Sequence, residues 1–216
     1  MSYTELNIDT WERKAHYHFF KAYEEPFFGV SVDIDCTNAY TIAKSNGISF
    51  FLFYLHKALT AANIVEAFRY RIMNDSVVIH DNVNAASTIN RPNGTFGFSN
   101  IEYKDSFEEF EKQARDEIEQ VRKGNDLLPS GAGDNVIHFS ALPWIKFTSV
   151  THARNFSFAD SCPKISIGKI TDVGGKKIMP FSVHVHHALM DGYHLGLFID
   201  EFQQLMNQGH LPLQSR

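Results

Sequence analysis

The clearest pattern of apolar and polar positions lies near the end of the chain. From Phe181 to Val185, apolar residues alternate with polar ones, which is the period of a half-buried strand. Beyond Gly192, apolar residues recur at steps of three and four positions, the spacing of one buried helix face: Leu195, Phe198, Ile199, Phe202, Leu205 and Met206. The pattern therefore predicts a strand, a tight turn and a helix, with Asp191 suited to cap the helix.

The same periodicities predict the other elements of the chain. Steps of three and four predict helices, and alternation or short apolar runs between turn residues predict strands. The predicted helices cover 11–20, 48–64 and 105–122, and the predicted strands cover 28–35, 68–72, 77–79, 95–99, 136–140, 164–170 and 177–185. Turn residues at 91–94 and 172–175 predict hairpins, and the glycines of 124–135 predict a connecting loop.

Length and composition fit one folded domain. The 216 residues are 44% hydrophobic and 13% aromatic, and no linker rich in Pro, Gly or Ser divides them. We therefore expect a single domain over residues 1–216. The formal net charge of −5 leaves no basic footprint for a polyanion, so we expect no nucleic-acid partner.

The sequence carries no pattern that predicts a membrane or an oxidising compartment. The first residues lack the basic and apolar segments of a signal peptide, and the longest apolar stretch, 48–59, is too short to span a bilayer. The two cysteines, Cys36 and Cys162, are too few for a disulfide framework. We therefore expect a cytoplasmic protein with reduced thiols and no membrane partner.

Imidazoles gather at the predicted turn, and three interpretations of them are open. His184, His186, His187 and Asp191 are all plausible zinc ligands, which would suit metal-dependent hydrolysis. In a chain with 11 histidines, they could instead be packed or surface side chains. The third interpretation is a general base, since imidazole titrates near neutral pH and can take a proton from an attacking hydroxyl. Spacing alone favours His187 and Asp191 as a catalytic dyad.

Residues 186–194, His-His-Ala-Leu-Met-Asp-Gly-Tyr-His, resemble the His-His-x-x-x-Asp-Gly motif of coenzyme A-dependent acyltransferases. Dihydrolipoyl acyltransferases and peptide-synthetase condensation domains carry similar motifs, so other landmarks must decide between them. Two are present, because 140–144 reads Ser-Ala-Leu-Pro-Trp and 11–13 reads Trp-Glu-Arg, matching a Trp-x-Arg segment. The chain is therefore most similar to the type A chloramphenicol acetyltransferases, over nearly its whole length.

The resemblance implies a fold and an assembly that periodicity does not show. The implied fold is α/β, a two-layer sandwich with a mixed, mostly antiparallel sheet covered by helices, as in chloramphenicol acetyltransferases. The implied assembly is a homotrimer with its sites between subunits. The implied reaction is direct transfer of the acetyl group of acetyl-coenzyme A, a co-substrate, to a hydroxyl of chloramphenicol in a ternary complex, giving antibiotic resistance. No tightly bound cofactor and no metal are implied.

Residue by residue, the resemblance gives the motif specific roles. His187 would be the catalytic base, and Ser140 would donate a hydrogen bond to the oxyanion of the tetrahedral intermediate. Asp191 would form an ion pair with Arg13 that holds the turn, in place of the dyad that spacing favours. His186 would be structural.

Three further residues would support the site. Ser166 stands where the family commonly has a threonine that holds an active-site water, and serine keeps that hydroxyl. Phe96 corresponds to an aromatic of the acceptor pocket, and Trp144 would shape the wall beside Ser140. The resemblance therefore predicts a site assembled from segments far apart in the sequence.

The acceptor side departs from the family pattern in two places. Relatives that acetylate the antibiotic tend to show His-x-Glu-x-Glu before Thr-Phe-Ser, whereas 90–97 reads Asn-Arg-Pro-Asn-Gly-Thr-Phe-Gly. His152, Arg154 and Asp160 are polar for a pocket that holds a nitrophenyl ring. Two alternatives therefore stay open: a coenzyme A-dependent O-acetyltransferase with a different small hydroxyl acceptor, and a non-catalytic protein that binds a small ligand. A dihydrolipoyl transferase core is less expected, because no lipoyl-bearing module precedes the domain.

Overall fold

A mixed sheet forms the centre of the protein in the computed structural model, which describes residues 2–128, 133–156 and 159–208. In spatial order it runs β2–β10–β8–β7–β5–β6, with β9 pairing to β10 outside this path. The bounds are β2 Phe27–Asp35, β5 Asn84–Asn90, β6 Phe96–Ile101, β7 Val136–Ala141, β8 Lys164–Ile167, β9 Thr171–Val173 and β10 Lys176–His186. Strands β8 and β5 lie parallel to β7, and the other described pairs are antiparallel. The expected mixed, mostly antiparallel sheet is confirmed.

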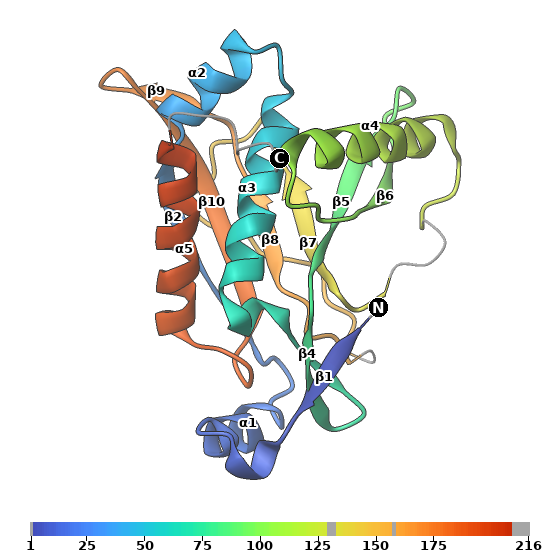
Figure 1. Ribbon diagram of the computed structural model, residues 1–216, viewed down its shortest axis with the longest axis vertical. Coiled ribbons are helices and arrows are strands. Elements are labelled where there is room, and N and C mark those ends of the chain that lie inside the picture. Colours follow the sequence, from blue (N-terminus) through green and yellow to red (C-terminus); the bar gives the residue numbers. More distant parts are fainter. Residues whose placement is uncertain (1, 129–132, 157–158, 209–216) are drawn as a thin grey trace.

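Helices form the second layer. They are α2 Thr37–Ser45, α3 Phe50–Ile64, α4 Phe107–Lys123 and α5 Gly192–Asn207, and a further helix, α1 Lys14–Phe20, lies apart from this layer at the lower end of the view in Figure 1. Figure 1 shows α3 and α5 side by side in front of the sheet, with α4 on the side of β5 and β6. Phe181 of β10 is fully buried, and the rings of Phe198 and Phe202 on α5 lie 6.0 and 4.7 Å from its ring. The apolar face of the strand and the apolar stripe of the helix, both visible in the sequence, therefore pack on each other.

Side-chain caps fix where the helices begin. Ser49 caps α3 and Ser106 caps α4, each by accepting a hydrogen bond from a backbone N–H of the first turn. The predicted helix over 48–64 therefore begins at Phe50. Asp191 caps α5 in the same way, as predicted. None of the helices in the described ranges is long and apolar enough to cross a membrane.

A second sheet of order β1–β4–β3 lies at the lower end of the view in Figure 1, near α1. The bounds are β1 Tyr3–Leu6, β3 Tyr70–Met73 and β4 Ser76–His80, with short 3-10 helices η1 Ile8–Thr10 and η2 Glu66–Arg69. Asn74 and Asp75 join β3 to β4 with φ angles of 48° and 67°, a left-handed turn that these residue types tolerate. Together, η1 and α1 bring the start of the chain to the end of β10.

Two predicted strands are wrong in part. The stretch predicted as 68–72 begins inside η2, and only Tyr70–Met73 is extended. The strand predicted over 164–170 ends at Ile167, and two residues later the Lys169 N–H donates a 2.8 Å hydrogen bond to the Ile145 carbonyl in the loop after β7 instead of to a neighbouring strand. The hairpin predicted across 172–175 forms between β9 and β10. Of the predicted loop 124–135, residues 129–132 lie outside the described residues.

Candidate active site

The sheet and α5 meet at the turn 187–191, at the lower end of β10 in Figure 1. The His187 N–H donates a 2.8 Å hydrogen bond to the Pro26 carbonyl, which fastens the turn to the start of β2. Ala188, Leu189 and Met190 are fully buried, so the middle of the turn is anchored in the core. The backbone that presents His187 is therefore held on both sides.

The imidazole of His187 is fixed by two aromatic rings and one carbonyl. It stacks on Phe20 of α1 with ring centroids 3.8 Å apart, and Phe28 of β2 lies 4.3 Å away at an inclined angle. Its Nδ1 atom lies 3.2 Å from the Met190 carbonyl oxygen. Because a carbonyl oxygen only accepts, Nδ1 carries the proton of this bond, and in the neutral ring Nε2 then carries the lone pair. This arrangement can serve as a general base through Nε2.

The carboxylate of Asp191 is bonded to Arg13. Arg13 Nη1 donates to Oδ2 at 2.5 Å, and Nη2 reaches the His187 carbonyl oxygen at 3.5 Å. The other carboxylate oxygen lies 2.9 Å from His194 Nδ1. Burial alone would raise the pKa of Asp191, but the hydrogen bonds from Arg13 and His194 outweigh it and lower the pKa to about 2. The dyad of His187 and Asp191 that spacing favoured does not form, and the ion pair implied by the resemblance is present.

His186 and His184 point to the other face of the sheet. The Nδ1 atom of His186 accepts a hydrogen bond from the Ala188 N–H at 3.3 Å, and burial lowers the pKa of His186 to about 4. The His184 ring lies over Gly29, where an added Cβ would come within 2.4 Å of it. With Asp191 already bound to Arg13, the motif residues do not converge on one point where a zinc ion could bind.

A different group, His138, Asp160 and Cys162, places three potential metal-ligating atoms within 4.8 Å of one another. The ammonium of Lys164 donates a hydrogen bond to the Asp160 carboxylate there. Burial raises the pKa of the Cys162 thiol, which favours the neutral form that does not bind metal well. The cluster is therefore already neutralised by a protein cation.

Ser140 and Ser166 belong to a row of serines that crosses four strands. Ser140 of β7 pairs with Ser166 of β8, which pairs with Ser182 of β10, which pairs with Ser31 of β2. Cross-strand partners point to the same face of a sheet, so these hydroxyls share the face that lies away from Phe181 and its helix partners. Ser166 and Ser182 are fully buried. Alternation within one strand indicates which face a serine occupies, but it does not reveal how serines align across strands.

Within one chain, His187 and Ser140 lie far apart. Ser182 precedes His187 by five positions, and at about 3.3 Å per residue the two are separated by roughly 16 Å along the strand. Ser140 lies two strands further across the sheet, or about 10 Å. One chain therefore brings together His187, Asp191 and Arg13, whereas Ser140 and Ser166 lie far from them on β7 and β8.

Phe96 and Trp144 are also remote from His187. Phe96 begins β6, at the opposite edge of the sheet from β2, and its side chain is 44% exposed. Trp144 follows β7 and is 64% exposed. Neither ring is packed in the core of the chain, so both are available to a ligand or to another molecule.

A cavity of about 870 Å³ opens at the N-terminal end of α3. Its walls are mainly apolar, with Phe50, Phe51, Leu52 and Tyr54 from α3, Ile118 from α4, and Ile89, Ala141, Ile167 and Met179 from the sheet. Ala141 and Ile167 directly follow Ser140 and Ser166, so the cavity reaches the ends of the strands that carry the serine row.

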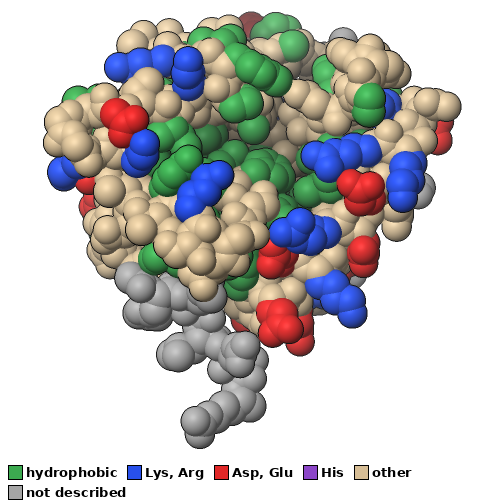
Figure 2. All heavy atoms as spheres, turned by 90° about the horizontal axis from the view of Figure 1, so that it is seen from above, with side chains coloured by type: hydrophobic (Ala, Val, Ile, Leu, Met, Phe, Trp, Pro, Cys, Tyr) green, Lys and Arg blue, Asp and Glu red, His purple; other side chains and the backbone are tan. Residues whose placement is uncertain are grey.

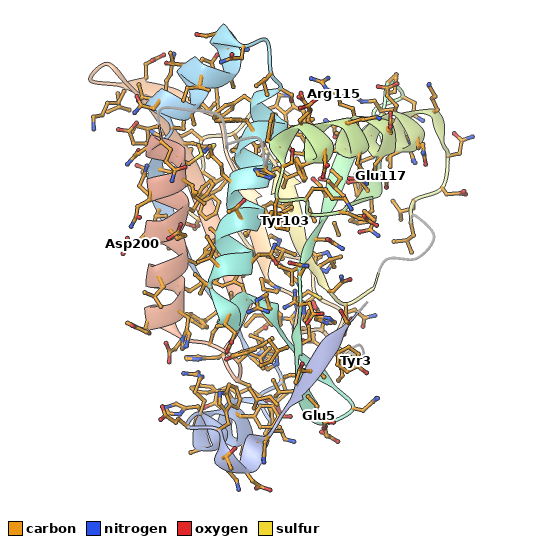
Figure 3. The ribbon with its side chains drawn as sticks, in the orientation of Figure 1. Tyr3, Glu5, Tyr103, Arg115, Glu117 and Asp200 are labelled. Atoms are coloured by element: carbon orange, nitrogen blue, oxygen red, sulfur yellow. The ribbon has the colours of Figure 1, made fainter. Side chains whose placement is uncertain are left out.

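Charged side chains surround this cavity, among them Arg115, Arg122 and Lys169, with Glu119. Figure 2, which looks onto this end of the molecule, shows a hollow lined by hydrophobic side chains with Lys and Arg side chains around it. Figure 3 shows Arg115 on the upper side of α4 and Glu117 on the lower side. The helix predicted over 105–122 gave no sign of this role for its charges, because helical periodicity separates apolar from polar positions but does not reveal a neighbouring cavity.

Comparisons with known proteins agree on one family. Residues 1–203 match the family profile described as chloramphenicol acetyltransferase. The chain is 30% identical to a chloramphenicol acetyltransferase of Escherichia coli, covering 95% of this chain and 94% of that protein. A solved chloramphenicol acetyltransferase structure superposes with a TM-score of 0.88 at 31% identity, covering 95% of this chain and all of that one. A probable dihydrolipoamide acetyltransferase from Listeria monocytogenes shares the fold alone, with a TM-score of 0.65 at 13% identity over 94% and 92% of the two chains.

Proposed function

The chain belongs to the chloramphenicol acetyltransferase family, and from that premise we propose that it transfers the acetyl group of acetyl-coenzyme A to a hydroxyl of chloramphenicol. Acetylation of the antibiotic in this way would give resistance to it. The single observation that carries the proposal is the orientation of His187, whose Nδ1 proton is committed to the Met190 carbonyl and whose Nε2 lone pair is left for chemistry.

In the proposed mechanism His187 acts as a general base in a ternary complex. Nε2 takes the proton of the acceptor hydroxyl while that oxygen attacks the thioester carbonyl. The tetrahedral intermediate then expels the coenzyme A sulfur, which takes the proton back from the imidazolium. No acyl-enzyme is formed. Phe20 and Phe28 keep the ring in one plane throughout, which lowers the entropic part of the barrier.

Ser140 stabilises the oxyanion in this scheme, and Ser166 holds a water beside it. A preorganised donor of this kind lowers the barrier by about 2.7–4 kcal/mol. The Ser166 hydroxyl is buried and has no hydrogen-bond partner among the described residues, which supports a bound water there. Phe96 and Trp144 form part of the acceptor pocket, and their exposure in one chain supports that role.

We propose that the site is shared between subunits of a homotrimer. The separation of His187 from Ser140 supports this, because both can act on one intermediate only if they come from different copies. Strand β2 supports it as well, because it is an edge strand that pairs with β10 on one side only. Its Val30 side chain is also 36% exposed. An exposed edge strand with an apolar residue favours association.

Acetyl-coenzyme A is the proposed occupant of the cavity beside α3. The apolar walls suit the pantetheine arm, and the cations Arg115, Arg122 and Lys169 suit the phosphates of the nucleotide.

Acetyl-coenzyme A is a co-substrate, so no tightly bound cofactor and no metal are needed. The partners are therefore two small molecules and further copies of the chain, with no nucleic acid and no membrane. Cys36 and Cys162 are free thiols, which supports a cytoplasmic location.

A second candidate acceptor is a more polar hydroxyl compound. His152 lies edge-on to His184, with ring centroids 4.9 Å apart, and its Nε2 atom is buried without a hydrogen-bond partner among the described residues. An acceptor with several hydroxyls could supply that partner.

The deciding experiment measures release of the coenzyme A thiol from acetyl-coenzyme A, with chloramphenicol as acceptor. The native chain should release thiol rapidly, and His187→Ala should lower turnover by orders of magnitude while the oligomer stays intact. Near-native turnover in His187→Ala would refute the base assignment. No release by the native chain with chloramphenicol, but release with a polyol, would move the acceptor to the second candidate.

A further inference from the structure

The segment that joins α1 to β2 holds His187 on three sides. Phe20, at the end of α1, stacks on the imidazole. The Pro26 carbonyl accepts the His187 N–H, and the Phe28 ring packs against the imidazole from β2. The position of the base therefore depends on how firmly 20–28 is fixed to the rest of the molecule.

A cation from a distant loop fixes this segment. The Arg154 guanidinium lies 3.7 Å from the centroid of the Phe27 ring, and its Nη1 donates a 2.6 Å hydrogen bond to Glu25 Oε1. The same Glu25 oxygen accepts the Phe27 N–H at 3.1 Å. The Arg154 side chain is only 10% exposed. One buried guanidinium thus contacts the residues on both sides of Pro26.

The Phe27 ring has a second cation and a second imidazole as neighbours. The Lys164 ammonium lies 4.7 Å from its centroid, and the His186 ring lies 5.4 Å away, edge-on. Lys164 is held by the Asp160 carboxylate. Phe27 is therefore in contact with groups from β8, β10 and the loop after β7. These contacts fix the backbone at Phe27 and so also fix its neighbours Pro26 and Phe28.

We propose that Arg154 is a positioning residue for the His187 base, a role that rests on the proposed function. By stacking on Phe27 and pairing with Glu25, Arg154 keeps the Pro26 carbonyl and the Phe28 ring against His187. A planar guanidinium can stack and donate in fixed directions at the same time, and a lysine ammonium can do only part of this. Arg154 itself does not touch the reacting atoms.

The first test compares Arg154→Met, Arg154→Lys and a control, Lys176→Met. Lys176 also pairs with a carboxylate, Asp35, but it is largely exposed and remote from the turn. We expect kcat to fall about 10- to 100-fold in Arg154→Met, because a base displaced by about 1 Å loses rate on that scale. The KM values for both substrates should stay within about twofold, Arg154→Lys should recover part of kcat, and Lys176→Met should match the native protein.

The second test measures the protonation of the His187 imidazole directly and needs no acetyl acceptor. In ¹⁵N NMR of histidine-labelled protein, with His187→Ala identifying the signal, the native ring should be protonated at Nδ1. Arg154→Met should show a mixture of the two ring tautomers. A purely structural role would lower the melting temperature and leave both kcat and the ring signals unchanged, and that result would overturn the proposal. A raised acceptor KM with unchanged kcat would overturn it too, by making Arg154 a direct acceptor contact.

Glu25→Gln covers the case in which Arg154→Met does not fold. This variant keeps an oxygen for the Phe27 N–H and removes the ion pair with Arg154. We therefore expect kcat to fall by only about two- to fivefold, with a correspondingly smaller change in the His187 tautomers. Because the NMR readout is independent of turnover, absence of chloramphenicol acetylation by the native protein would refute the proposed function and leave this inference to be decided by the ring signals.

Discussion

The Nδ1 atom of His187 lies 3.2 Å from the carbonyl oxygen of Met190. A backbone carbonyl thus orients this imidazole, where many catalytic histidines are oriented by a carboxylate. A carbonyl is neutral, so it fixes the tautomer without placing a negative charge beside the ring. The orientation of the proposed base therefore depends on the backbone of the turn, and Asp191 would act on it only through that backbone.

Asp191→Asn should weaken the turn and lower activity indirectly. The carboxylate is about one-third exposed, so we expect a loss of about 1–3 kcal/mol in the free energy of unfolding, below the range for a fully buried pair. Urea unfolding at fixed protein concentration measures the loss, and Asp9→Asn is the control, since Asp9 pairs with Lys14 at the surface. An unchanged unfolding midpoint in Asp191→Asn would contradict the prediction.

The ion pair of Arg13 and Asp191 should make the free energy of unfolding depend on pH in the acidic range. The folded pKa of Asp191 is lowered from 3.8 to about 2, so its contribution is present above pH 3.8 and is lost as pH falls towards 2. The difference in unfolding free energy between the native protein and Asp191→Asn should therefore shrink across that interval. A difference that stays constant from neutral pH down to 2 would show that the ion pair is not its source.

Mixed oligomers test the shared site. His187→Ala and Ser140→Ala chains should each be nearly inactive, the latter by about 10²–10³-fold in kcat. If base and serine come from neighbouring subunits of a ring, unfolding and refolding the two variants together should restore about a quarter of native activity, because random assembly gives each site both intact residues with that frequency. No recovery in the mixture would mean that both groups act from the same chain.

The cations around the cavity should affect the co-substrate and not the chemistry. Arg122→Ala or Lys169→Ala should raise the KM for acetyl-coenzyme A by about fivefold, since an exposed charge contact contributes up to about 1 kcal/mol. The effect should fade at high salt because exposed charges are screened. Lys112→Ala, on the same helix but away from this cavity, should leave the KM unchanged. A larger effect on kcat than on KM would argue against coenzyme A binding there.

Lys57 should destabilise the fold at neutral pH. Its ammonium is buried with no hydrogen-bond partner among the described residues, it lies 4.8 Å from the Phe53 ring centroid, and burial lowers its pKa from 10.5 to about 8. The unfolded chain therefore binds more protons between pH 8 and 10.5, so stability should rise with pH across that interval.

Lys57→Met removes this cost, and we expect it to raise the free energy of unfolding by roughly 2–3 kcal/mol at pH 7 and to flatten the rise above pH 8. Urea unfolding at several pH values measures both effects. Lys44→Met is a matched control, because Lys44 also lies over an aromatic ring, Tyr40, but at the surface. Lower stability in Lys57→Met would show that the ammonium has a favourable partner.

The sequence predicted most of the fold where one face of an element is buried. Phe181 to Val185 and the stripe on α5 are local patterns, and each pattern reports a buried face correctly. The errors lie where a close contact overrides the pattern. The strand predicted through Gly168 stops early, and Lys169 bonds to the carbonyl of Ile145, a residue 24 positions earlier that leaves no mark on the local alternation.

The candidate site shows the same limit. The turn with His187 and Asp191 is continuous in the sequence, and Asp191 could be predicted as a cap from its position alone. The stacking of Arg154 on Phe27 joins positions 127 residues apart, and both residue types are ordinary at the surface. The serine row required strand register, and register is decided by pairing between strands rather than within one.

If the site is shared between subunits as proposed, the wide separation of His187 from Ser140 has a genetic consequence. A chain in such an assembly gives its base to one site and its serine to another, so a chain that is damaged at both positions impairs two neighbouring sites while its own fold remains sound. In a cell that makes intact and damaged chains together, co-assembly would spread the defect among healthy subunits. The damaged copy would then behave as a dominant allele rather than a silent one.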